Sequence, residues 1–189
     1  MNAAARVRAA LPVLVTAAAV AASAVLWHNL PEPTDVSGPF DVHGAMGEPV
    51  HGRALVVTVT GIRLSSRVEA PRRPPVAAAG EWVVVDAELQ ATAGFVLPVV
   101  DLQVGPNTYI RSERFRTTQL GGEVAPGITQ RGSWVFDVAP STLDAATQLQ
   151  LRVWHGDGRL DSRVVVAIPL RDRHRPADLV ALDPVERRG

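Results

Sequence analysis

Alternation of apolar and polar side chains with a period of two is the feature that most restricts the fold of this chain. The pattern runs through residues 55–64, 82–90, 133–138, 148–153 and 164–170. Successive side chains of a strand point to opposite faces of a sheet, so each segment predicts a half-buried strand. Between residues 40 and 170, helical periodicity lasts about one turn, around 141–146. The pattern therefore predicts an all-β domain.

Turn residues divide these strands. Gly105-Pro106-Asn107 and His155-Gly156-Asp157-Gly158 have the composition of tight turns, and the second predicts a hairpin. About seven short strands separated by turns are typical of an antiparallel sandwich or barrel. Trp134 and Phe136 share one face of a single strand, so both are expected in the core.

A run of 19 residues, Ala9 to Trp27, holds only two polar side chains, Thr16 and Ser23. A helix of this length spans roughly the 30 Å hydrocarbon core of a bilayer. Arg6 and Arg8 precede the run, and this charge asymmetry predicts a cytoplasmic N-terminus at 1–8. We therefore expect residues 9–29 to form a transmembrane signal anchor. The alternative is a cleavable signal peptide with a small-residue site at Ala22-Ser23-Ala24.

The remaining chain is long enough for one domain with a substantial core. Residues 30–39 contain three prolines and read as an extended linker. The sandwich is expected over 40–170. Residues 171–189 then form a C-terminal tail, which we expect to be solvated, with contact to a partner or to lipid headgroups as the alternative.

Composition excludes several classes of function. There is no cysteine, which excludes disulfides, thiolate metal sites and a lipid-modified cysteine. All 19 basic residues are arginine and balance 19 carboxylates, and this neutrality argues against nucleic acid as a partner. Arginine without lysine, together with abundant alanine, valine and glycine, is typical of a high-GC genome such as that of an actinobacterium.

Three sequence blocks carry a resemblance to a known family. A glycine-rich entry (Gly44, Gly47, Gly52) precedes the strand at 55–64, and Glu81 to Leu89 reads Glu-Trp-Val-Val-Val-Asp-Ala-Glu-Leu. The block 120–140 places Pro126-Gly127 before Phe136-Asp137-Val138-Ala139-Pro140. Residues 50–170 thus resemble the immunoglobulin-like extracytoplasmic domains of unknown function in Gram-positive and actinobacterial membrane proteins. The resemblance implies an immunoglobulin-like antiparallel β-sandwich, and the apolar run described above places one N-terminal transmembrane helix before it.

A search for reactive groups finds no catalytic constellation. His43 and His51 are close in sequence, but they are better explained as solvated loop residues than as metal ligands. Asp86 and Glu88 share one strand face, where residues two apart usually serve solubility rather than acid–base catalysis. Asp157 and Asp161 fit a hairpin turn better than a calcium loop. We therefore expect no catalytic residue, no metal and no cofactor.

Two arginine-bearing segments are candidates for partner contact. Residues 65–80 separate two strands and are longer than most loops, which favours either a mobile linker or a contact surface. The candidate contact residues are Arg67, Arg72 and Arg73 in this segment and Arg171, Arg173 and Arg175 in the tail. The expected function is a single-pass, membrane-anchored, non-enzymatic binding or accessory module that presents its domain outside the cytoplasm to an envelope protein. The alternative is a secreted or anchored carrier of a small apolar envelope ligand.

Overall fold

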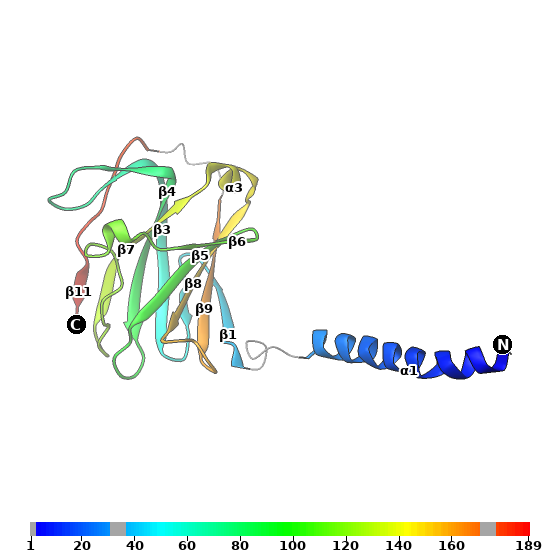
Figure 1. Ribbon diagram of the computed structural model, residues 1–189. Helices are drawn as coiled ribbons and strands as arrows, with labels where there is room; N and C mark the ends of the chain where they lie inside the picture. The colour runs from blue at the N-terminus through cyan, green and yellow to red at the C-terminus, as the bar shows by residue number, and fades with distance from the viewer. Residues whose placement is uncertain (1–2, 31–36, 171–176) are drawn as a thin grey trace. The chain divides into compact units, whose positions relative to one another are not determined.

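The computed structural model describes residues 3–30, 37–170 and 177–189, with backbone only for residues 3–11 and 14. The chain divides into two compact units, Met1–Gly38 and Pro39–Gly189. The first contains helix α1 (Ala3–His28), and the second is a β-sandwich of two sheets (Figure 1). The all-β prediction for the domain is therefore confirmed.

The two sheets differ in size. The smaller has five strands in the order β1 (Phe40–Ala45), β9 (Ser162–Pro169), β8 (Gln148–His155), β5 (Pro98–Val104), β6 (Asn107–Ile110). The larger has six, in the order β10 (Val180–Ala181), β3 (Leu55–Glu69), β4 (Val76–Ala91), β7 (Thr129–Val138), β11 (Glu186–Arg188), with β2 (Pro49–His51) also pairing with β3. Two short helices complete the domain, the 3-10 helix η1 (Glu113–Phe115) and α3 (Pro140–Ala145).

Most neighbouring strands are antiparallel, as the turn signals predict. The hairpin after His155 joins β8 to β9, and the turn at Gly105 joins β5 to β6. Two pairings are parallel, β1 with β9 and β10 with β3. A parallel pair cannot be closed by a tight turn, so local turn chemistry carries no signal for these two pairings.

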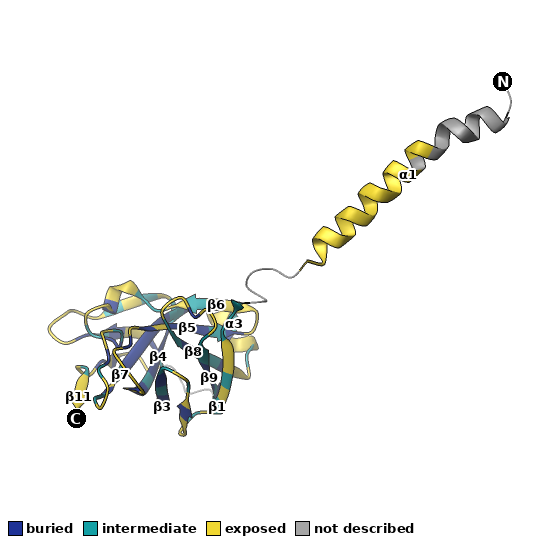
Figure 2. Ribbon diagram, turned by 90° about the horizontal axis from the view of Figure 1, so that it is seen from below, coloured by how far each residue is buried: buried dark blue, intermediate teal, exposed yellow. Residues whose placement is uncertain are grey.

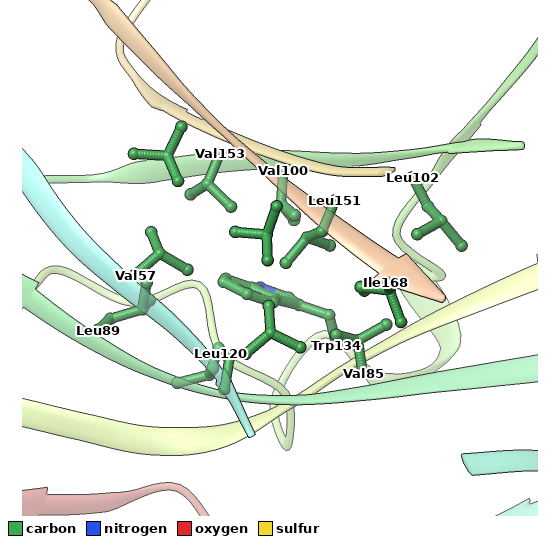
Figure 3. Packing of buried hydrophobic residues seen from close by; sticks show 14 of the residues in the cluster. Val57, Val85, Leu89, Val100, Leu102, Leu120, Trp134, Leu151, Val153 and Ile168 are labelled. Atoms are coloured by element: carbon green, nitrogen blue, oxygen red, sulfur yellow. The ribbon is translucent and has the colours of Figure 1, made fainter. Parts of the chain in front are cut away.

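The core lies between the sheets, where the inward rows of both meet (Figure 3). Trp134 of β7 lies between the layers in Figure 3, with Leu151 and Ile168 of the smaller sheet among the residues around it. Trp134 and Phe136 are fully buried, which confirms the prediction made from their shared strand face. Alternation along each strand therefore places the apolar rows correctly.

A second apolar cluster covers the outer face of the larger sheet. Trp82 and Val84 belong to the row of β4 that was expected to face solvent, yet both are fully buried. Phe115 of η1 meets Trp82 edge-on, with ring centroids 5.2 Å apart, and Val180 and Leu182 of the C-terminal segment join the same cluster. Two expectations are thus corrected. This part of β4 is buried on both faces, and the C-terminal segment is not simply solvated, because the two pack against each other.

Helix α1 exposes every side chain described in it (Figure 2). Val25, Leu26 and Trp27 are among them. Among the side chains described, no helix combines the length and apolarity needed to cross a membrane. The expected transmembrane span at 9–29 is therefore not confirmed.

Candidate functional site

The segment 65–80 is a strand hairpin and not the long loop that was expected. β3 continues to Glu69 and β4 begins at Val76, so only six residues join them. The register shifts where Ser65 pairs with Trp82 and Arg67 with Ala77, so the extra residues are on β4, and such irregularities mark positions where strands bend. The hairpin reaches beyond the rest of the larger sheet (Figure 1). A rigid element, and not a free linker, therefore carries the candidate arginines.

Arg72 and Arg73 lie in the exposed turn of this hairpin. The backbone N–H of Arg73 donates to the carbonyl of Ala70 at 3.0 Å, which closes the turn. Arg72 has a φ of 62°, a left-handed conformation that is strained for a residue other than glycine. Neither side chain forms an ion pair with any described residue. Both guanidinium groups are therefore available to a partner.

Three further arginines lie near the turn. Arg67 is exposed on β3, and its Nε donates to the carbonyl of Asp178 at 3.4 Å. Arg114 of η1 donates to the carbonyl of Ala77 at 3.0 Å and stacks over the ring of Trp82 at 5.9 Å. Arg116 and Pro71 line one pocket of about 360 Å³. We call this group the arginine end: Arg67, Arg72, Arg73, Arg114 and Arg116.

Arg114 and Arg116 were missed by sequence reasoning. They are about forty residues from the hairpin turn, and only the folding of η1 against the larger sheet brings them close. Arg171, Arg173 and Arg175, the other candidate contacts, lie outside the described residues.

The C-terminal segment crosses the outer face of the larger sheet. The carbonyl of Ala181 accepts a hydrogen bond from Arg63 Nη1 at 3.1 Å. Arg63 also forms a two-pronged ion pair with Asp86, at 2.9 and 2.6 Å, and Asp86 accepts from the hydroxyl of Ser133 at 2.6 Å. These groups line a polar pocket of about 550 Å³ together with Asp183.

The polar groups of this pocket are held in hydrogen bonds and ion pairs with one another. The Ser133 hydroxyl donates to a carboxylate already paired with Arg63, so neither group is positioned to activate it as a nucleophile. Glu88, the other carboxylate of the supposed acid–base pair, lies 3.8 Å from Arg131. Both carboxylates therefore have ion-pair partners. The arrangement attaches the C-terminal segment to the sheet.

The outer face of the smaller sheet carries a row of charges. Asp41 accepts two hydrogen bonds from Arg163 at 2.7 and 2.9 Å, and Asp101 accepts two from Arg152 at 2.6 and 2.7 Å. The hydrogen bond from Arg163 lowers the pKa of Asp41 despite partial burial. The hydrogen bond to Asp101 likewise raises the pKa of Arg152. These pairs connect four neighbouring strands.

The remaining candidates do not converge. His43 and His51 are both exposed. Across the described residues, no three histidine, aspartate or glutamate side chains gather as a metal site requires. Asp157 accepts a hydrogen bond from the backbone N–H of Arg159 at 3.1 Å, the bond of a turn.

No protein-family model matches this chain, and no curated protein matches it. Among solved structures, it is similar to an uncharacterised β-sandwich protein from Clostridium difficile 630, with 14% identity, 73% of this chain and 99% of that chain covered, and a TM-score of 0.45. It is also similar to MPT63, a secreted protein from Mycobacterium tuberculosis, with 18% identity, 67% and 97% coverage, and a TM-score of 0.47. A conserved hypothetical protein from Bacillus anthracis has 20% identity, 63% and 93% coverage, and a TM-score of 0.46.

Proposed function

We propose that this protein is a non-enzymatic binding module of the bacterial cell envelope, and that the arginine end is its contact surface. The observation that carries the proposal is the exposed, strained turn that holds Arg72 and Arg73 beyond the sheet. Backbone strain persists where the surrounding structure enforces it, and it gathers at ligand clamps and other functional positions.

The chemistry of the arginine end favours an acidic protein surface as the partner. Glu113 lies 3.9 Å from Arg116, but Arg67, Arg72 and Arg73 have no carboxylate partner among the described residues. Guanidinium groups match carboxylates in two-pronged geometry, and arginine is enriched among residues that dominate binding energy. Because the Arg114 side chain is already fixed over Trp82, part of the surface is organised before binding.

A carrier of a small apolar ligand is the alternative function. It requires a cavity between the two sheets, of the few-hundred-Å³ size usual for ligand sites. Trp134, Phe136 and Leu151 are fully buried in the cluster that occupies this space. Neither pocket described above is lined by any of these three residues. The binding module is therefore the better proposal.

Location in the envelope is part of the proposal. The apolar run 9–27, the two arginines before it and the resemblance to extracytoplasmic domains support a membrane-retained helix with the sandwich outside. We expect the full chain to stay in the membrane fraction after a carbonate wash. Recovery of a soluble chain that begins near Val25 would contradict retention and favour cleavage.

Contact through the arginine end is tested with paired double variants. Arg72→Ala with Arg73→Ala removes two tip charges, and Arg131→Ala with Arg188→Ala removes two charges from the polar pocket. A photo-reactive residue placed at Glu69 reports crosslinked envelope proteins in cells. We expect the first pair to abolish the crosslinked band that the second pair retains. A band that survives the first pair unchanged would refute contact through this surface.

A further inference from the structure

Exposed apolar side chains gather at the end of the sandwich where the chain enters it. Between residues 39 and 189, seven large apolar side chains are described as exposed. Four of them lie at this end and are 57–65% exposed, and we call them the apolar rim: Phe40, Phe95, Leu97 and Leu160. A group of exposed large apolar side chains at one end of a domain usually marks an interaction site.

Strand register brings these four residues together from three segments. Phe40, the first residue of β1, is paired with Ser162, the first residue of β9, and its N–H donates to the carbonyl of Asp161 at 2.8 Å. Leu160 is therefore in the loop beside Phe40. The N–H of Leu97 donates to Nδ1 of His155 at 3.2 Å, at the end of β8 where that same loop begins. Phe95 is two residues before Leu97.

Leu160 is held in an unfavourable conformation. Its φ is 51°, in the left-handed region that favours glycine, although its side chain is 58% exposed. Nothing in the packing of the domain requires an apolar side chain at this loop position. A strained backbone that presents leucine to the outside is explained if that leucine contacts another apolar phase.

Covalent connection indicates which apolar phase this is. Residues 29–39 join helix α1 to Phe40, and eleven residues reach at most about 40 Å. The rim is thus joined by one short linker to a helix whose own apolar side chains are exposed. We propose that the apolar rim inserts into the lipid surface around the helix, an inference that rests on the membrane retention proposed above.

Charges near the rim fit apolar insertion better than electrostatic adsorption. Arg53 donates to the carbonyl of Leu160 at 3.4 Å and is exposed, but Asp157 and Asp161 flank the same loop. Arg159 is paired with Asp157 at 3.7 Å. Lipid contact should therefore persist without anionic lipid. The arginine end, at the opposite end of β3 and β4, then faces away from the lipid.

The test uses site-specific nitroxide labels, because the chain has no cysteine that would compete. The full chain is reconstituted in vesicles of phosphatidylcholine with phosphatidylglycerol, and in phosphatidylcholine alone. Single labels are placed at Leu160→Cys, at Val20→Cys in α1 and at Arg72→Cys on the arginine end. Relaxation by oxygen, which concentrates in lipid, is compared with relaxation by an aqueous nickel complex.

Labels at positions 160 and 20 should shift to the lipid-exposed ratio in both vesicle types, while the label at 72 stays aqueous. Combining Phe40→Ser, Phe95→Ser and Leu97→Ser should return the label at 160 to water without lowering the melting temperature. A lipid-exposed label at position 20 with an aqueous label at position 160 would refute lipid insertion of the apolar rim and leave membrane retention of the helix standing. Aqueous labels at both positions overturn the membrane retention as well. A lipid signal at 160 that requires phosphatidylglycerol overturns apolar insertion.

Discussion

The two sheets share one core but present different outer faces. On the larger sheet, Trp82 and Val84 are sealed beneath Phe115 and the C-terminal segment. On the smaller sheet, the equivalent face carries the charged pairs Asp41–Arg163 and Asp101–Arg152. Both sheets are built from alternating strands, so the periodicity that predicts one buried face says nothing about what lies on the other.

The difference shows how the larger sheet is stabilised on two sides. Burial of apolar area contributes to stability wherever it occurs, so the outer cluster adds to the inner core. Ion pairs on the smaller sheet contribute less, because the cost of removing both charges from water offsets much of their attraction; the side chains of Arg152 and Asp101 are only 17% and 11% exposed. Apolar truncations on the larger sheet should therefore be costly on both faces, and those on the smaller sheet mainly on the inner face, with the buried Val165 as the exception on its outer face.

The largest difference between the two outer faces is expected when the tryptophan on each face is replaced by alanine. Trp82→Ala should cost about 3–5 kcal/mol, because a fully buried ring leaves a cavity and removes the hydrogen bond from its Nε1 to the carbonyl of Val76. Trp154→Ala, on the half-buried outer face of β8, should cost about 1 kcal/mol. Denaturant unfolding measures both. Equal costs would show that the two outer faces are alike.

The second prediction concerns the C-terminal segment. Leu182→Ala should cost about 2 kcal/mol, since Leu182 is only 4% exposed and covers the outer face of the larger sheet. Leu179→Ala, three residues earlier and 41% exposed, should cost less than about 1 kcal/mol. Unfolding curves of the two variants test this. A negligible effect of Leu182→Ala would mean that the segment does not stabilise the sheet.

The inward rows could be predicted from sequence because alternation is a local property of each strand. Trp134 and Phe136 were placed correctly for that reason. The burial of Trp82 could not be predicted in this way, because the residues that pack over it are distant in sequence. They are Phe115 and Leu182, and Leu182 is a hundred residues away. The weakly apolar residues of the tail were the available signal. Their burial could be inferred only together with the outward-facing apolar residues of β4 that they cover.

The candidate site was predicted in part. Arg72 and Arg73 are exposed and form no ion pair within the described part of the chain, as their charge and flanking prolines suggest. The hairpin that holds them was mistaken for a loop because Pro74 and Pro75 obscured the start of β4. Arg114 and Arg116 had no sequence signal, since only three-dimensional packing places η1 beside the hairpin.

The third prediction tests the charged row of the smaller sheet. The pKa of Asp41 is lowered by its hydrogen bond from Arg163, so its ionised form stabilises the folded state above the ordinary carboxyl range. That stability is lost as the pH falls through the lowered pKa. Asp41→Asn should therefore cost less than about 1 kcal/mol at neutral pH and nothing in strong acid. Melting temperature against pH measures the difference, with Asp157→Asn as the exposed control. A pH-independent effect would contradict this mechanism.

The smallest effect is expected at Glu81, on the inward row of β4 at the edge of the core. Burial raises its pKa, and repulsion from Asp144 adds to the shift, while Oε1 is buried without a described hydrogen-bond partner. A raised carboxyl pKa means that the folded state prefers the protonated form, so its stability falls as the pH rises through the raised pKa. Glu81→Gln should therefore raise the melting temperature slightly at neutral pH and leave it unchanged in acid.

Glu88→Gln, which breaks an ion pair with Arg131, should give no gain. The pH-dependent effects at Glu81 and Asp41 have opposite signs because only one of the two carboxylates has a charged partner. Glu81 is desolvated at the edge of the core, and its Oε1 has no described hydrogen-bond partner. Asp41, on the outer face of the smaller sheet, accepts two hydrogen bonds from Arg163. A destabilised Glu81→Gln variant at neutral pH would refute that account.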